Sequence, residues 1–158
     1  QSFADGAAGQ ACLDSQGIAA DESPASARAQ IDHYFSLPSV PTIVAALEAA
    51  QGEWERATAA LLRQRSPLML HVVLEQIRRA RTMTIAQDLR MERDLVRHCL
   101  HLRPGQSEML EGIRALAIDK DKTPRWNPPR IEDVTPELVE AFFASPWPAD
   151  LHPLARLA

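Results

Sequence analysis

The feature that most constrains this chain is the recurrence of a serine or threonine just ahead of a proline, followed by apolar residues at helical spacing. Ser66-Pro67, Thr135-Pro136 and Ser39-Val40-Pro41 all have this form. A hydroxyl side chain caps the free N–H groups of a first turn, and a proline there loses no hydrogen bond. Each site therefore predicts the start of a helix and argues against a central strand.

Two more helix starts carry capping residues without proline. Thr84 is followed three residues later by Gln87, which is the capping-box pattern, and Ser107 precedes another helical period. No stretch alternates apolar and polar residues with the β-branched character of a strand. The predicted fold class is therefore all-α, a bundle of about six helices.

The chain divides into three parts by composition. Residues 1–29 are rich in Ala, Gly, Ser, Gln and Asp and predict a flexible linker segment. Residues 30–144 predict one helical domain, whose first helix is expected from about Ile31. Residues 145–158 predict a proline-broken tail.

Apolar residues at helical spacing predict which helix faces are buried. Glu92, at the border of one stripe, is expected to be a buried, hydrogen-bonded acid. Gly112 inside a helix is expected where a neighbouring group approaches the backbone closely. The expected buried stripes are Leu70, Val73, Leu74 and Ile77; Ile85, Leu89, Val96 and Cys99; and Leu110, Ile113, Leu116 and Ala117.

Composition excludes several classes of function. With 46% hydrophobic and 24% charged residues, the chain is typical of a soluble globular protein. The net charge of -4 offers no basic surplus for nucleic acid, and no run of eighteen apolar residues predicts a membrane span. Only Cys12 and Cys99 are cysteines, which favours a reduced, cytoplasmic location. Because the chain begins at Gln1, we expect processing, proteolysis or a cloned piece of something longer.

The residues alone do not predict a catalytic centre. His98 and His101 flank Cys99, but the other histidines lie in unrelated elements, so no metal site is predicted. We interpret Glu111 and Arg114, three residues apart, as an intrahelical ion pair. Residues 119–129 are dense in charge and proline and predict a solvated loop, in which Trp126 is interpreted as a packing anchor.

Several motifs in order resemble a known family. They are Glu111-Gly112-Ile113-Arg114-Ala115-Leu116, Ile118-Asp119-Lys120-Asp121, Pro124-Arg125-Trp126 and Glu132-Asp133-Val134-Thr135-Pro136. Their order and spacing resemble the carboxy-terminal signature of 3-hydroxyisobutyryl-CoA hydrolases, members of the crotonase superfamily. The likeness covers roughly Ile31 to Phe143.

The resemblance implies a larger α/β enzyme, of which this chain is the carboxy-terminal helical layer. An amino-terminal crotonase core would bind the acyl-CoA and supply the oxyanion hole and the catalytic carboxylate, so no residue of this chain is assigned a catalytic role. Coenzyme A is part of the substrate, and no other cofactor is implied. The implied partners are that core, the acyl-CoA and, in some relatives, a second subunit.

The same resemblance implies a contact with the coenzyme A nucleotide. In related hydratases an aromatic residue and a lysine after the Glu-Gly helix touch the nucleotide. Here Leu116 stands at the aromatic position, and Lys120 reaches the lysine position with a shift of one residue. Lys120 and Lys122 are therefore the candidate coenzyme A-binding residues, since an ammonium group is a good partner for phosphate.

Two alternatives remain beside the hydrolase. An enoyl-CoA hydratase or isomerase of the same superfamily is the nearer one, although hydratases more often run from the helix into a basic segment than into Ile118-Asp119-Lys120-Asp121. A stand-alone helical interaction module without activity is the other. Isolated from a catalytic core, this chain is expected to be inactive.

Overall fold

The computed structural model describes residues 24–157, which divide into two units between Leu37 and Pro38. In the first unit, helix α2 spans Pro24–Phe35 and carries an exposed Arg28–Asp32 ion pair of 3.8 Å. This helix begins earlier than the expected Ile31, so the last residues of the predicted linker are helical. Residues 1–23 of that segment lie outside the described part, and the predicted division of the chain stays a prediction.

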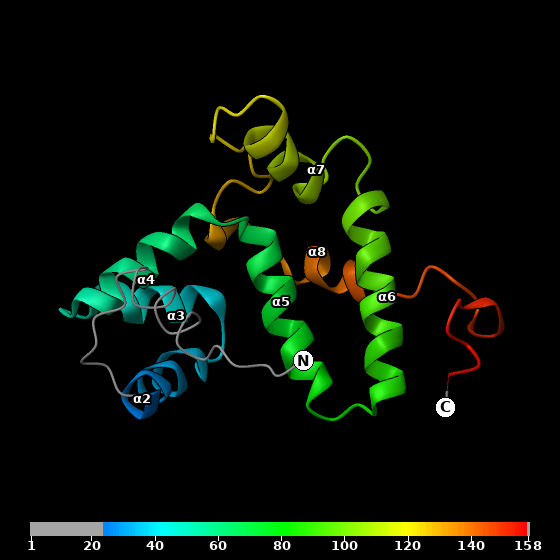
Figure 1. Cartoon of the computed structure of the whole chain (residues 1–158), viewed down its shortest axis with the longest axis horizontal. Helices are drawn as coiled ribbons and strands as arrows, with labels where there is room; N and C mark the ends of the chain where they lie inside the picture. Colours follow the sequence, from blue (N-terminus) through cyan, green and yellow to red (C-terminus); the bar gives the residue numbers. More distant parts are fainter. Residues whose placement is uncertain (1–23, 158) are drawn as a thin grey trace, which may run out of the picture. The chain divides into compact units, whose positions relative to one another are not determined.

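All the elements of the second unit among its described residues are helices or helical turns, which confirms the all-α prediction (Figure 1). With α2, the residues from 24 to 157 contain seven α-helices. No helix among them has the length and apolar character needed to cross a membrane. The α-helices of the second unit are α3 (Val40–Ala49), α4 (Glu53–Gln64), α5 (Pro67–Ala80), α6 (Ile85–His101), α7 (Glu108–Ile113) and α8 (Pro136–Glu140). A π-helical turn, η1 (Arg114–Ile118), continues α7, and three 3-10 turns follow, η2 (Ile131–Asp133), η3 (Ala141–Phe143) and η4 (Ala149–Leu151).

All five predicted caps form. In each case the hydroxyl oxygen accepts a backbone N–H three residues ahead, and Thr84 and Gln87 complete the capping box. These bonds satisfy N–H groups that a first turn leaves free, which fixes where five helices begin. The capping residues are Ser39, Ser66, Thr84, Ser107 and Thr135.

The main core lies between α5, α6 and η3. Leu68 and Val72 of α5 meet Met91 and Leu95 of α6, and Phe142 of η3 completes the cluster. Figure 1 shows α5 and α6 running side by side with α8 between them. A smaller cluster joins Val40 and Val44 of α3 to Ile131 of η2, so the chain after the loop returns to pack on the first helices of the unit.

The predicted buried stripes were only partly right on α5 and α6, where Leu70, Leu74 and Cys99 pack against buried clusters. Val73 and Ile77 are 47% and 52% exposed, and Ile85 and Val96 are 81% and 58% exposed. Both helices carry apolar residues on more than one side, so periodicity alone does not select the side that packs. The buried side of α6 contains the polar residue Asp94, which periodicity counts against burial.

The same prediction failed on α7 and η1. Leu110, Ile113 and Leu116 are exposed, and the buried positions are Glu108 and Ala115. Glu92 is exposed as well and accepts a 3.3 Å hydrogen bond from Gln76. The buried acid of α6 is instead Asp94, whose carboxylate lies 3.1 Å from Nε2 of His152.

The carboxy-terminal tail docks on one stripe of α6. His152 is buried and its Nδ1 accepts the backbone N–H of Leu154 at 2.9 Å, so the proton lies on Nε2 and is donated to Asp94. Arg90 donates to the carbonyl oxygens of Leu154, Ala155 and Leu157. The guanidinium groups of Arg93 and Arg97 lie 5.1 and 5.2 Å from the Trp147 ring centroid. The tail is therefore an ordered part of the second unit.

Candidate functional site

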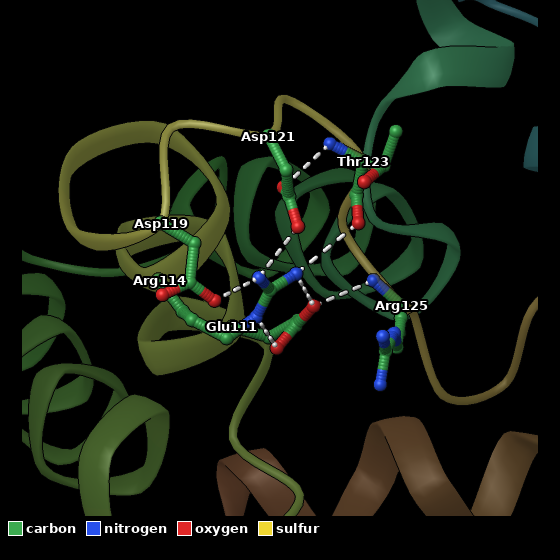
Figure 2. A network of polar contacts seen from close by, with 6 residues as sticks. All are labelled: Glu111, Arg114, Asp119, Asp121, Thr123 and Arg125. Atoms are coloured by element: carbon green, nitrogen blue, oxygen red, sulfur yellow. Dashed lines mark hydrogen bonds and ion pairs between the residues drawn. The ribbon is translucent and has the colours of Figure 1, made fainter.

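The loop after η1 folds around one arginine (Figure 2). Nε and Nη2 of Arg114 donate to the two carboxylate oxygens of Glu111 at 2.9 and 2.8 Å. Nη1 donates to Asp119 at 2.6 Å and to Asp121 at 2.8 Å, and Nη2 also donates to the carbonyl of Thr123 at 3.2 Å. The predicted Glu111–Arg114 pair is confirmed, and it is the base of a larger network.

Backbone hydrogen bonds close the same loop. The N–H of Lys122 donates to the carbonyl of Ala115 at 3.0 Å, and that of Asp119 to the carbonyl of Arg114 at 2.8 Å. Asp121 in turn accepts the N–H of Thr123 at 2.9 Å. Lys120 and Lys122 both adopt a φ of 56°, the left-handed conformation that side chains other than glycine rarely take.

The network keeps its acids ionised. Arg114, and then the backbone N–H of Arg125 at 2.7 Å, lower the pKa of Glu111 from its ordinary value near 4.5 to about 2. The N–H of Thr123, and then Arg114, hold the pKa of Asp121 below its usual value. Glu111 is the first of three carboxylates that raise the pKa of Arg114. One guanidinium thus forms ion pairs with three carboxylates.

Lys120 and Lys122 are both exposed, and neither forms an ion pair within the described residues. Lys122 lines an open cavity of about 860 Å³ between the junction of α4 with α5 and the α7–η1 segment, whereas Lys120 does not. Arg63 and Arg65 also line it, and its one acid, Glu108, is buried. Its apolar wall includes Met69, Ile113, Leu116 and Trp126. The lining therefore suits a ligand with an anionic end and an apolar body.

Trp126 anchors the far end of the loop, as the sequence predicted. Its Nε1 donates to the carbonyl of Gln64 at 3.2 Å. A Cβ placed on Gly112 would lie 3.4 Å from the Trp126 ring, an ordinary contact, so the ring lies beside α7 without coming close enough to require glycine there. This contact ties the loop to both walls of the cavity.

Glu108 is a polar residue of this region that sequence reasoning missed. Its side chain is only 4% exposed. It accepts a hydrogen bond from the Ser66 hydroxyl and another from the N–H of Asn127 at 2.9 Å, and Arg103 lies 3.9 Å away. The first-turn glutamate after Ser107 resembles an ordinary helix-start acid in sequence. Nothing in the pattern indicates that a serine 42 residues earlier meets it.

The histidines around Cys99 do not come together. His98 is buried and its Nε2 lies 2.8 Å from the carbonyl of Ala144, whereas His101 is exposed. Burial raises the pKa of the Cys99 thiol, which lowers its thiolate fraction and thus its nucleophilicity. Among residues 24–157, no group of three potential ligands is placed to hold a metal ion.

Comparisons with known proteins point to one family. The family model described as enoyl-CoA hydratase/isomerase matches residues 4–143. The small ribosomal subunit protein mS47 of Arabidopsis thaliana is 38% identical, over 72% of this chain and 28% of that protein. The 3-hydroxyisobutyryl-CoA hydrolase 1 of the same plant is 36% identical, over 72% of this chain and 31% of that protein.

A solved structure agrees with these relatives. The crystal structure of an enoyl-CoA hydratase from Rhodobacter sphaeroides matches with a TM-score of 0.68 and 32% identity, over 85% of this chain and 41% of that one. This chain therefore spans about a third of the length of the curated relatives it matches.

Proposed function

This chain belongs to the enoyl-CoA hydratase/isomerase family, and from that premise we propose that it is the carboxy-terminal helical part of an acyl-CoA thioester hydrolase. The proposed substrate is 3-hydroxyisobutyryl-CoA, an intermediate of valine catabolism, which water splits into 3-hydroxyisobutyrate and free coenzyme A. The bond broken is the thioester C–S bond. Water supplies the new oxygen on the acyl carbon, and the departing sulfur takes up a proton.

The catalytic groups of that reaction belong to the amino-terminal crotonase core, the proposed partner of this helical layer. Donors aimed at the developing oxyanion supply several kcal/mol in acyl transfer (roughly 3–4 per donor). The layer closes one side of the substrate site, and the large apolar side chains it exposes on α5, α6 and η1 suit contact with the core.

The observation that carries the proposal is the Arg114-centred loop from Asp119 to Arg125. The segment carries the hydrolase-like motifs, and its fold presents two lysines without carboxylate partners, one of them at the cavity. We assign Lys120 and Lys122 to the phosphates of the coenzyme A nucleotide. The apolar wall beside Lys122 suits the less polar remainder of an acyl-CoA.

An enoyl-CoA hydratase is the second candidate, favoured by the match to the Rhodobacter sphaeroides structure. Hydration adds water across a carbon–carbon double bond and leaves the thioester intact. The two candidates therefore differ in whether free thiol appears. The similarity to mS47 favours a third role, a helical module used for interaction, in which neither reaction occurs.

One pair of assays separates these candidates in the full-length protein. Release of coenzyme A from 3-hydroxyisobutyryl-CoA is followed with a thiol reagent, and hydration of crotonyl-CoA by the loss of its enoyl absorbance. The hydrolase proposal expects thiol release to be the faster reaction. Faster hydration supports the hydratase and rejects the hydrolase. If neither reaction occurs, the interaction role is supported, whether or not the protein binds acyl-CoA.

The isolated chain provides the matching control. Because it lacks the oxyanion donors and the carboxylate of the proposed core, it is expected to release no coenzyme A above the buffer rate. Thiol release by the isolated chain would contradict the assignment of the chemistry to a core outside it.

A further inference from the structure

Arg114 has no donor left for a ligand. A guanidinium has five N–H groups, and the five hydrogen bonds to Glu111, Asp119, Asp121 and Thr123 use all of them (Figure 2). It also does not line the cavity that Lys122 lines. All the hydrogen bonds of its guanidinium are made to the loop and to Glu111 of α7. Arg114 can therefore affect ligand binding only by fixing the conformation of the loop.

The backbone conformation of this loop is unfavourable for its two lysines. Left-handed backbone at a residue with a Cβ is disfavoured, and it persists only where surrounding contacts determine the conformation. Here Lys120 and Lys122 both have a φ of 56°, and the two aspartates that alternate with them are both held by Arg114. The side-chain bonds of both aspartates to a cation thus converge on Arg114, beside the backbone hydrogen bonds that close the loop.

We propose that Arg114 is a positioning residue, which holds the 119–125 loop in the conformation that presents Lys120 and Lys122 to the phosphate groups of the ligand. The proposal rests on the proposed nucleotide contact of these lysines. A preformed loop spares the ligand the free energy of ordering it. Without Arg114 the lysines keep their charge but lose their fixed placement.

Arginine is specific for this task. Its planar fork bonds both oxygens of Glu111 and still reaches two aspartates and a carbonyl, whereas a lysine ammonium has three donors at a single point. Arg114→Lys therefore keeps the positive charge and loses the geometry. A role of Arg114 as a distant charge predicts that lysine rescues function, and a positioning role predicts that it does not.

The test uses the full-length protein with three variants, Arg114→Gln, Arg114→Lys and Arg79→Gln. Arg79 of α5 is the matched control because it also joins two carboxylates, Glu75 of the same helix at 2.8 Å and Glu140 of α8. The first readout is trypsin cleavage after Lys120 and Lys122, mapped by mass spectrometry, which needs no activity. The second is the separation of KM from kcat with the acyl-CoA substrate.

The expected result is that both Arg114 variants are cleaved at these lysines at least about fivefold faster than wild type and the Arg79 variant, because local opening exposes the loop. KM is expected to rise with kcat nearly fixed, by no more than the roughly two- to fivefold expected when both lysines are removed, because Arg114 acts on binding only through their placement. Equal cleavage in all proteins overturns the proposal. So does rescue of KM by Arg114→Lys.

The outcome of the lysine double variant Lys120→Ala/Lys122→Ala distinguishes the two levels of the proposal. If that variant raises KM and Arg114→Gln does not, the positioning role is overturned while the nucleotide contact stands. If cleavage rises in the Arg114 variants but neither they nor the lysine variant change KM, the nucleotide contact fails and only the hold of Arg114 on the loop is supported.

Discussion

Glu108, the first residue of α7, accepts the hydroxyl hydrogen bond of Ser66, the residue that caps α5. The same hydroxyl oxygen accepts the N–H of Met69 at 3.2 Å, so the cap and the contact between helices share one side chain. The other carboxylate oxygen accepts the N–H of Asn127. One buried acid thereby joins the start of α5, the start of α7 and the end of the loop.

Glu108→Ala is expected to lower the free energy of unfolding by about 1–3 kcal/mol, because it leaves the buried Ser66 hydroxyl without its carboxylate acceptor. Urea denaturation followed by circular dichroism measures the change. Glu92→Ala is the matched control on an exposed acid and is expected to change little. Equal losses for the two variants would contradict the structural role of Glu108.

The stability of the protein should depend on pH through Glu111. Its pKa is near 4.5 when unfolded and about 2 when folded, so its contribution is complete above about 4.5. It is lost as the pH falls from there toward 2, because the unfolded chain binds the proton first. Unfolding free energies of wild type and Glu111→Gln should therefore differ most above pH 4.5 and converge below it. Parallel curves from pH 6 to pH 2 would be the contrary result.

Gly112 has room for one methyl group. A Cβ there would lie 3.4 Å from the Trp126 ring, which is ordinary contact, and alanine favours a helix by about 1 kcal/mol over glycine. We expect Gly112→Ala to be as stable as wild type or more so. Gly112→Val should displace the ring and weaken its bond to Gln64. Thermal unfolding of both variants, with Trp fluorescence as the probe, would refute this if alanine destabilised as much as valine.

The isolated chain should self-associate through the apolar side chains that it exposes on α5 and α6. Val73 and Ile77 of α5 and Ile85 and Val96 of α6 expose about half or more of their surface. Sedimentation velocity at rising concentration should show oligomers, and the paired substitution Ile77→Lys with Val96→Lys should reduce them. A monomer at all concentrations in wild type would count against the proposed cover by a core.

The two loop lysines are expected to act on binding alone. Removing both in Lys120→Ala/Lys122→Ala should raise KM for the acyl-CoA by roughly two- to fivefold, because exposed charged contacts contribute well under 1 kcal/mol each. The kcat should hold, since the contact is present in substrate and transition state alike. Added salt should shrink the effect. Identical constants at low salt would remove the nucleotide contact and leave the family membership untouched.

Sequence reasoning predicted the helix starts better than the helix faces, for a physical reason. A cap such as Thr84 is decided within three residues, so its signal is local. The face that α6 buries is decided by Leu68 of α5 and by Phe142, which lie far away in the chain. A pattern of apolar spacing contains no information about which of two apolar sides has a partner.

The candidate site divides in the same way. The Glu111–Arg114 pair followed from spacing, and the loop motifs followed from the resemblance. The sequence did not predict that Asp119 and Asp121 bind the same guanidinium, because this contact depends on the left-handed backbone at Lys120 and Lys122. A run of alternating charges in sequence gives no sign of which side chains turn inward.

The hold of Arg90 on the tail acts on the main chain, since its three acceptors are the carbonyl oxygens of Leu154, Ala155 and Leu157. Every residue type offers the same carbonyl, so exchanging these three side chains leaves the attachment in place. Adding or removing a residue between His152 and Leu157 would instead shift the carbonyls out of reach while His152 stayed fixed on Asp94. The attachment of this segment to α6 should therefore tolerate substitutions at these three positions but not insertions or deletions between His152 and Leu157.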